Sequence, residues 1–186
     1  IGDVVFNVRE ESNPCSLCAK LRKGAFNDKA KELGLVNTNF ENTTGLHDEN
    51  HYSCAKDMAI IAQKLIEIGG NHLLEITSTY DAYIRENTEN PFWLVNTNKL
   101  VKHVESIDGL KTGFTQEALS CITVTAIKDN VRMIGVVMKE PDSKTRNKEI
   151  VELIQFGLSQ MKYQPLLKKD DIFMEYEFGN GKPNLA

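Results

Sequence analysis

Two short motifs in the sequence have the residue types and the spacing that acyl-transfer chemistry uses. Lys111, Thr112 and Gly113 form a Lys-Thr-Gly triplet inside the strand-like stretch IDGLKTGFT, and this triplet is one of the motifs found around acylated serines. Ser53 and Lys56 have the Ser-x-x-Lys spacing, in which a lysine one helical turn away can accept the serine proton. Acyl transfer needs a nucleophile and a base, so the two motifs must share one site to be active.

The cysteines and histidines raise a separate question of metal or redox chemistry. Cys15 and Cys18 form a C-x-x-C, a spacing typical of metal binding or redox chemistry in a reducing compartment. Two thiolates fill half of a four-ligand site, so the pair either holds zinc or iron–sulfur or is a free or oxidised pair, and we favour the latter. His47, His51 and Cys54 also have metal-like spacing, but we interpret these histidines as solvated or capping residues of a loop.

The first half of the chain predicts helices separated by one long loop. A helix is expected over 25–33, and residues 37–52 are rich in Asn, Thr, Asp and Gly, which is typical of a loop. Apolar residues recur at helical spacing over 54–68, with Ser53 placed to cap the helix and two glycines to end it. A shorter helix around 71–77 is expected to follow.

The second half predicts a strand pair and a closing helix. Residues 121–128 alternate as a strand does, and 131–138 form a second, more apolar strand. The Asp-Asn pair between them suits a two-residue hairpin turn, because both residues tolerate left-handed backbone angles. Asp142 or Ser143 is placed to cap a helix over about 144–161. The pattern predicts a mixed α/β fold in which helices pack on an antiparallel sheet.

Length and composition indicate one globular domain without a general affinity for nucleic acid. The chain has 186 residues and a formal net charge of −4, so it lacks the basic footprint of nucleic-acid or anionic-membrane binding. No apolar run approaches the roughly 18–20 residues that a membrane span needs. The sequence starts at Ile1, and no basic and apolar leader follows, so we expect a cytoplasmic location if the chain is made as written. Residues 3–8 are expected to form a short strand.

Residues 27–186 resemble the penicillin-binding D-alanyl-D-alanine carboxypeptidases, which are serine peptidases that trim peptidoglycan stem peptides. The resemblance implies a sheet covered by helices, as in the serine β-lactamases. It also implies acylation of a serine by a peptide ending in D-Ala-D-Ala, release of D-alanine, and hydrolysis, with β-lactams as alternative ligands. The stretches that carry it occur in the family's order: NDKAKELGLVNTNFENTTGL, HYSCAKDMAIIAQKLI, LVNTNKL, IDGLKTGFT and, after Arg146, GLSQMKYQPLLKK.

The same resemblance implies roles for five residues. Lys111 would supply positive charge, Thr112 a hydroxyl for the substrate carboxylate, and Gly113 room for the substrate backbone. The backbone N–H of Phe114 would be one of two oxyanion-hole donors. Arg146 aligns with an arginine that contacts the terminal carboxylate, a task suited to its planar guanidinium.

The nucleophile that these residues would serve is absent from the expected place. In the family both Ser-x-x-Lys and Ser-x-Asn precede the stretch that begins at Asn27, and neither occurs in residues 1–26. Ser53 falls later, where the family has an ordinary helix start, so we interpret it as a helix cap. We therefore expect this chain to be inactive alone, to lack the N-terminal part of the fold, and to self-associate through exposed sheet edges and apolar faces.

Residues 1–34 resemble a different family, the PP-loop ATPases that install sulfur in tRNA cytidine. The string NPCSLCAKLRKG carries this resemblance, and it implies that Cys15 and Cys18 help to hold an iron–sulfur cluster. The predicted organisation is a foreign segment over 1–26, the carboxypeptidase-like part over 27–162, and the start of a truncated β domain over 163–186. The join near residues 24–34 is a natural recombination, an assembly artefact or an engineered fusion, and a non-functional chimera is the alternative to either function.

Overall fold

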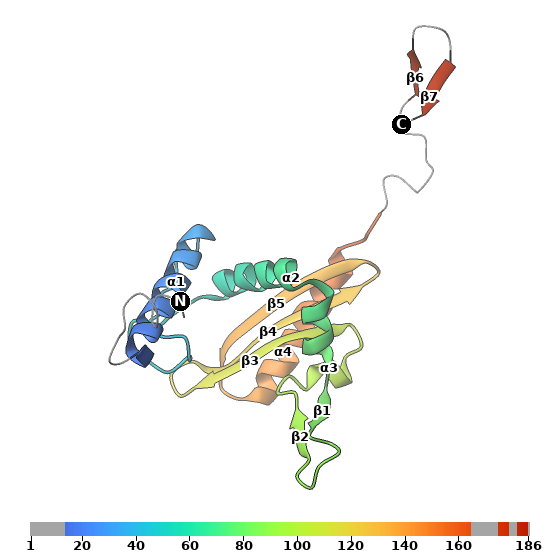
Figure 1. The fold of residues 1–186 in the computed structure, drawn as a ribbon. Coiled ribbons are helices and arrows are strands. Elements are labelled where there is room, and N and C mark those ends of the chain that lie inside the picture. The colour runs from blue at the N-terminus through green and yellow to red at the C-terminus, as the bar shows by residue number, and fades with distance from the viewer. Residues whose placement is uncertain (1–13, 165–174, 179–181, 186) are drawn as a thin grey trace.

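The structure is a computed structural model that describes residues 14–164, 175–178 and 182–185 (Figure 1). Four helices and seven strands occur in the described part of the chain. In sequence order they are α1 (Pro14–Glu32), α2 (Ala55–Ser78), β1 (Asp81–Ile84), β2 (Phe92–Val95), α3 (Leu100–His103), β3 (Ile107–Thr115), β4 (Leu119–Lys128), β5 (Val131–Glu140), α4 (Ser143–Gln160), β6 (Glu175–Phe178) and β7 (Lys182–Leu185).

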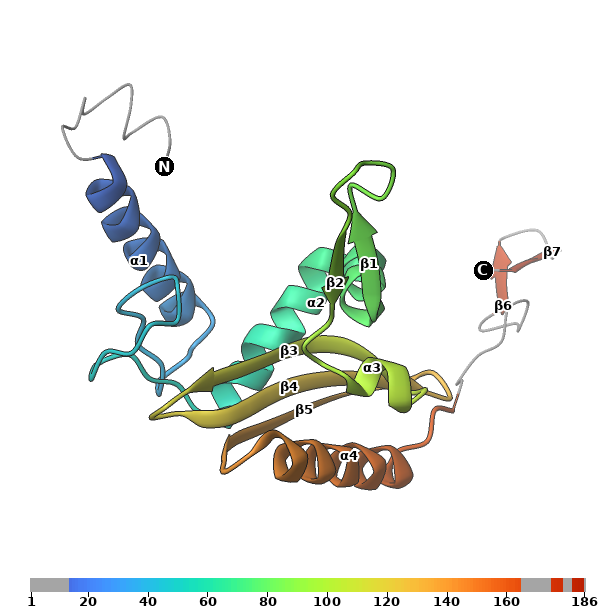
Figure 2. The same ribbon diagram turned by 90° about the horizontal axis from the view of Figure 1, so that it is seen from below.

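The centre of the fold is an antiparallel sheet in the order β3-β4-β5, with a helix on each face (Figure 2). Helix α4 packs along β4 and β5 on one face, while α2 crosses the other face and contacts both β3 and β5. The core lies between α4 and the sheet, where burial of apolar side chains supplies the main stabilising free energy. Its fully buried members include Ile122, Val124, Ala126, Ile150 and Ile154. The predicted mixed α/β class is confirmed.

Local sequence signals explain the two ends of β5. Asp129 and Asn130 have φ angles of 49° and 62°, so both adopt the left-handed conformation that a tight hairpin between β4 and β5 requires. The Asp142 side chain accepts hydrogen bonds from the backbone N–H groups of Lys144 and Thr145 at 2.7 and 2.8 Å. The predicted turn is confirmed, and of the two candidate caps of α4 it is Asp142 that acts.

Helix α2 combines the two helices that the sequence predicts. It runs from Ala55 to Ser78, but Gly70 has φ 52° and ψ −146°, which is not helical and divides the element there. Glycine adopts such angles at no steric cost. The prediction that Ser53 caps this helix is wrong. The helix begins at Ala55, so the N-cap is Cys54, which makes no side-chain capping bond. The Ser53 hydroxyl instead bonds the Thr38 hydroxyl at 2.9 Å.

Helix α1 is longer than the predicted segment 25–33. It begins at Pro14 and continues without interruption to Glu32, since proline is well suited to the first position of a helix, where its missing N–H is not needed. The helix therefore runs through the predicted boundary between residues 26 and 27. That boundary and the other domain limits stay predictions, as does the proposed join.

The hairpin of β1 and β2 was not predicted from the sequence. Asp81–Ile84 pairs with Phe92–Val95, and the Tyr83 and Trp93 rings stack at 6.3 Å between centroids. All eight strand residues are exposed, so the hairpin adds an apolar surface and no core. The short strand expected over 3–8 lies outside the described residues. In the tail, β6 and β7 pair with each other.

The carboxylate of Glu140 at the end of β5 is a predicted site of destabilisation. Its burial, and then the nearby carboxylates of Glu149 and Asp142, raise its pKa above the ordinary value. When the pKa of a carboxyl is higher in the folded state than in the unfolded state, the fold loses stability as the pH rises above the ordinary pKa of the group. The cause is that the folded state disfavours the charged carboxylate. Replacing Glu140 with Gln should therefore raise the melting temperature at pH 7 and leave it unchanged near pH 3.5.

The matched control for this prediction is Glu152→Gln, measured by differential scanning fluorimetry at both pH values. Glu152 lies on α4 with its carboxylate 3.9 Å from the Lys148 amine, so the control neutralises a carboxylate that faces a cation. It should give no gain at pH 7. An equal gain from both variants would show that net charge, rather than the surroundings of Glu140, sets the effect.

Candidate active site

The Lys-Thr-Gly triplet lies in the second half of β3, on an edge of the described sheet. The Lys111 amine is exposed and donates to the Thr112 carbonyl oxygen at 2.5 Å. The Thr112 hydroxyl donates to the Thr97 hydroxyl at 2.8 Å. A Cβ atom added to Gly113 would meet nothing within 4 Å, and Phe114 is 66% exposed. These residues form an open stretch at the edge of the sheet, along which an extended ligand has room to lie.

Three polar residues before β3 hold this strand in place. The Asn98 side chain is buried, and it donates to the Gly109 carbonyl oxygen at 3.1 Å while accepting from the Leu100 N–H at 3.2 Å. The Asn96 amide donates to two carbonyl oxygens at the end of α2. The Asn-Thr-Asn segment at residues 96–98 thus supports the triplet strand, through Asn98 on Gly109 and Thr97 on Thr112.

Arg146 lies behind the sheet rather than on the open face of β3. It projects from the first turn of α4, is 7% exposed, and donates from Nη1 to the Cys121 carbonyl oxygen at 3.4 Å. Cys121 is the partner of Gly113 in the register of β3 and β4, so the guanidinium is one strand away from the triplet. Burial lowers the pKa of Arg146. The Asn147 Oδ1 atom accepts hydrogen bonds from the Nε–H and Nη2–H groups of Arg146 at 3.1 and 2.8 Å.

The Ser-x-x-Lys match at Ser53 and Lys56 has a structural role in this fold. Thr38 donates its hydroxyl proton to the Asp57 carboxylate at 2.7 Å, so Ser53 is the donor in its 2.9 Å bond to Thr38. Asp57 also accepts from the Asn37 N–H at 2.9 Å. These bonds, that of Thr38 first, lower the pKa of Asp57. The serine hydroxyl thus points its proton at a structural network and not at a general base.

The structure does not bring the other candidate ligands together. Cys15 and Cys18 are free thiols on α1, and no group of three or more His, Cys, Asp or Glu side chains that could hold a metal occurs among the described residues. His51 accepts from the Glu41 N–H at 3.2 Å, while His47 lies 3.5 Å from the Glu117 carboxylate. The two histidines therefore stabilise separate parts of the loop, and ligation of a metal by the cysteine pair stays a prediction.

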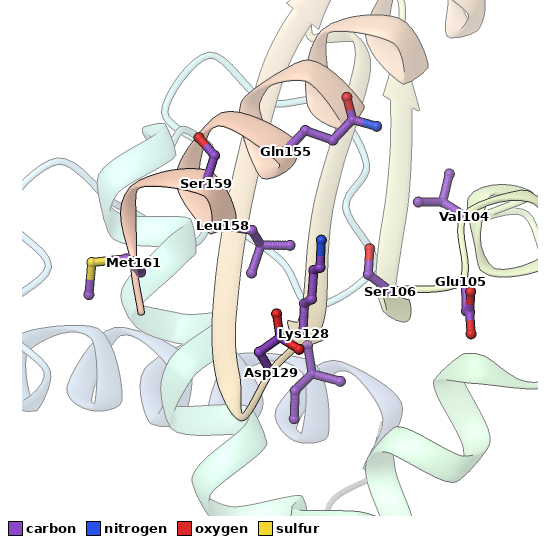
Figure 3. Close-up of a pocket in the computed structure, with 10 residues that line it drawn as sticks. Val104, Glu105, Ser106, Lys128, Asp129, Gln155, Leu158, Ser159 and Met161 are labelled. Atoms are coloured by element: carbon purple, nitrogen blue, oxygen red, sulfur yellow. The ribbon is translucent and has the colours of Figure 1, made fainter. Parts of the chain in front are cut away.

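A hollow of about 730 Å³ lies at the opposite end of the sheet from the triplet (Figure 3). Its walls come from the end of β4, the residues before β3 and the end of α4. Because Lys128 ends β4 and Asp129 begins the turn after it, this hollow is separated from Gly113 by most of the length of β3. It shares no residue with the candidate site. The lining residues are Val104, Glu105, Ser106, Ile127, Lys128, Asp129, Gln155, Leu158, Ser159 and Met161.

The fold and the Lys-Thr-Gly strand of this chain are similar to those of the penicillin-binding proteins. A crystal structure of penicillin-binding protein D2 from Listeria monocytogenes with cefotaxime bound matches with a TM-score of 0.65 and 32% sequence identity. The match covers 73% of this chain and 54% of that chain. The Streptomyces K15 DD-transpeptidase matches with a TM-score of 0.67, covering 73% of this chain and 53% of that chain. At 24% identity, this second likeness supports the fold alone.

The family follows from the sequence comparisons. Residues 24–142 match the model of the D-alanyl-D-alanine carboxypeptidase family, so the chain belongs to this family. It is 46% identical over 156 residues to the D-alanyl-D-alanine carboxypeptidase DacF of Bacillus subtilis, covering 84% of this chain and 40% of DacF. It is 35% identical over 136 residues to DacA of Haemophilus influenzae, covering 72% of this chain and 33% of DacA.

The chain thus spans less than half the length of these curated relatives. The predicted family and fold class are confirmed. The resemblance of residues 1–34 to the tRNA sulfurtransferases gains no support from these matches and stays a prediction. Within the described part of the chain, no helix has both the length and the apolar character that crossing a bilayer requires.

Proposed function

We propose that this chain is the C-terminal part of the catalytic domain of a serine-type D-Ala-D-Ala carboxypeptidase, and that it contributes one wall of the substrate site. The observation that carries the proposal is the exposed second half of β3, where Thr112 is fixed by Thr97 and the space beside Gly113 is open. An edge strand of this kind can pair with an extended peptide through its backbone groups.

The proposed roles follow from the chemistry of each group. Lys111 supplies positive charge to an anionic substrate, Thr112 offers a hydroxyl to the terminal carboxylate, and the Phe114 N–H stabilises an oxyanion. Because Arg146 donates to the carbonyl of the neighbouring strand, we propose that it acts on the carboxylate only after its side chain is reoriented, or else holds β4 in place. The ligands proposed for the site are stem peptides ending in D-Ala-D-Ala and β-lactams.

We further propose that the chain alone has no peptidase activity. The serine nucleophile and its lysine would have to come from residues beyond those of the printed sequence, because the Ser53 hydroxyl is bonded to Thr38, which in turn donates to Asp57. The remaining groups bind and polarise a substrate but cannot form the acyl intermediate. We propose a cell-envelope location for the complete enzyme, because peptidoglycan trimming takes place there. As a lone chain, its further proposed partner is a second copy of itself.

The test is incubation of the purified chain with a fluorescent penicillin, followed by intact-mass spectrometry. We expect no covalent adduct from the parent chain, and an unchanged result from a Ser53→Ala variant. A stoichiometric adduct that disappears in the Ser53→Ala variant would show that Ser53 is an activated nucleophile and would overturn the proposal. A chain from the same family that carries the Ser-x-x-Lys and Ser-x-Asn motifs serves as the positive control.

A further inference from the structure

Arg146 is a buried cation whose hydrogen-bond acceptors are all neutral. It is 7% exposed, and its guanidinium donates to Asn147 Oδ1 at 3.1 and 2.8 Å and to the Cys121 carbonyl oxygen at 3.4 Å. None of the ion pairs among the described residues includes Arg146. Buried charges in proteins are usually paired with an opposite charge, because their removal from water is costly. A buried guanidinium without a carboxylate partner therefore needs a physical explanation.

The acidic groups near the start of α4 do not compensate this charge. Glu149 follows Arg146 by one helical turn, but its carboxylate acts on that of Glu140. Asp142 accepts from two backbone N–H groups as the cap of the helix. The Cys121 thiol donates its proton to a backbone carbonyl oxygen at 3.3 Å. An acid from outside the printed sequence has little access, because this chain already covers all but 7% of the arginine.

We propose that Asn147 is a positioning residue for the substrate site: its amide oxygen holds the Arg146 guanidinium in place and leaves the positive charge available to an anionic ligand on the triplet strand. Cys121 is the register partner of Gly113, so the cation lies one strand behind the place proposed for the substrate carboxylate. Charges interact more strongly through protein than through water, because the effective dielectric constant is lower. The inference rests on the proposed function and adds a role that Arg146 can fill while buried.

An amide at position 147 suits this role better than a carboxylate would. Asparagine and aspartate have nearly the same shape, and an Oδ1 atom of either can accept the same two hydrogen bonds. An aspartate would form the stronger, charge-assisted pair with Arg146, but it would also neutralise the guanidinium. The Asn147→Asp variant should therefore be more stable than the parent chain and bind an anionic ligand less tightly. A merely structural role would change both properties in the same direction.

The first measurement is the melting temperature of the purified chain at pH 7. Asn147→Asp should raise the melting temperature by at least about 2 °C. The matched control is Asn90→Asp, which adds the same charge at an exposed position between β1 and β2 and should give no gain. In an Arg146→Gln background the gain from Asn147→Asp should disappear. This double-mutant comparison separates pairing with Arg146 from any effect of the new charge on the dipole of α4.

The second measurement is binding of N-acetyl-D-alanyl-D-alanine, followed through the backbone amide signals of residues 111–114 in a nitrogen-15 NMR titration. The dissociation constant of Asn147→Asp should be about threefold to tenfold higher than that of the parent chain. The same peptide with a C-terminal amide is uncharged, so the parent chain and Asn147→Asp should bind it with dissociation constants that agree within about twofold. Asn90→Asp should bind both peptides as the parent chain does.

The outcomes separate this inference from the proposed function. If the parent chain binds neither peptide, the proposed substrate wall and the role of Asn147 are both overturned. If Asn147→Asp binds the carboxylate peptide as tightly as the parent chain does, only the role of Asn147 is overturned. The same follows if Asn147→Asp does not melt at a higher temperature, or gains equally in the Arg146→Gln background. Should Arg146→Gln not fold, the comparison with Asn90→Asp still decides. Higher stability with weaker binding of the carboxylate peptide alone supports the inference.

Discussion

Replacing Gly135 with valine should lower the free energy of unfolding by about 2–4 kcal/mol. A Cβ atom at this position would lie 2.8 Å from Ile150 Cδ1 and 3.0 Å from Ile154 Cδ1. Both isoleucines are fully buried in the core, so their Cδ1 methyl groups can make room only by rotating into closely packed surroundings. Valine favours strands by up to about 1 kcal/mol, which is smaller than the cost of overpacking. The steric clash therefore outweighs the strand preference, and the variant should be less stable than the parent chain.

The comparison that isolates the steric term is Gly113→Val, in the same sheet. A Cβ atom there would meet nothing within 4 Å, so only strand preference should act and the stability should change little or rise. Urea unfolding with a common m-value measures both variants. If Gly135→Val were as stable as the parent chain, the Cδ1 methyl groups of Ile150 and Ile154 would have made room at little cost, and the overpacking prediction would be wrong.

A loss of about 2–4 kcal/mol is also expected from replacing Asn98 with leucine, an apolar residue of similar size. Asn98 is 1% exposed and bonds the Gly109 carbonyl oxygen and the Leu100 N–H. Gly109 and Leu100 are themselves buried, so the variant leaves one acceptor and one donor without water or a partner. Each buried unsatisfied group costs about 1–3 kcal/mol. Equilibrium unfolding in urea provides the measurement.

An exposed hydrogen bond of similar length is the control for Asn98. The Thr88 hydroxyl donates to the Arg85 carbonyl oxygen at 2.8 Å in the β1–β2 turn, where water can replace it. Thr88→Val should cost about 0.5–1 kcal/mol at most. Equal losses at the two positions would mean that burial of Asn98 does not set its importance. Because Gly109 lies two residues before Lys111, loss of Asn98 should also loosen the strand that carries the triplet.

The parts of the fold that the sequence predicted are those with a strong local cause. The Asp129-Asn130 turn and the Asp142 cap depend on side chains that act on their own backbone, so neighbouring residues were sufficient to predict them. The β1–β2 hairpin was missed because its strands are four residues each and bury no face. Its turn-rich connection, with Asn, Thr and Pro between two apolar runs, is a signal that could have revealed it.

The candidate site was predictable in its residues but not in its arrangement. The triplet and its strand follow from the motif, whereas nothing in the sequence singled out Asn98 as the side chain that supports this strand. Three features depend on contacts between distant segments. These are the bond from Thr112 to Thr97, the placement of Arg146 behind β4, and the engagement of Ser53 by Thr38. Spacing along the chain carries no information on such contacts, so a Ser-x-x-Lys match cannot by itself be distinguished from a structural serine.

The division of α2 at Gly70 has a mechanical consequence. In the first half of the helix, Ala55 and Ala59 line a small apolar hollow beside β5, together with Met133 and Gly135. The second half holds β3 through the 2.8 Å bond from Thr77 to the Asp108 carbonyl oxygen. A straight helix would act as a lever between the two sheet edges. With a joint at Gly70, a displacement of the first half can be absorbed by rotation at one residue. We therefore expect a substitution at Ala59 to disturb the strand that carries Lys111 less than one at Thr77 would.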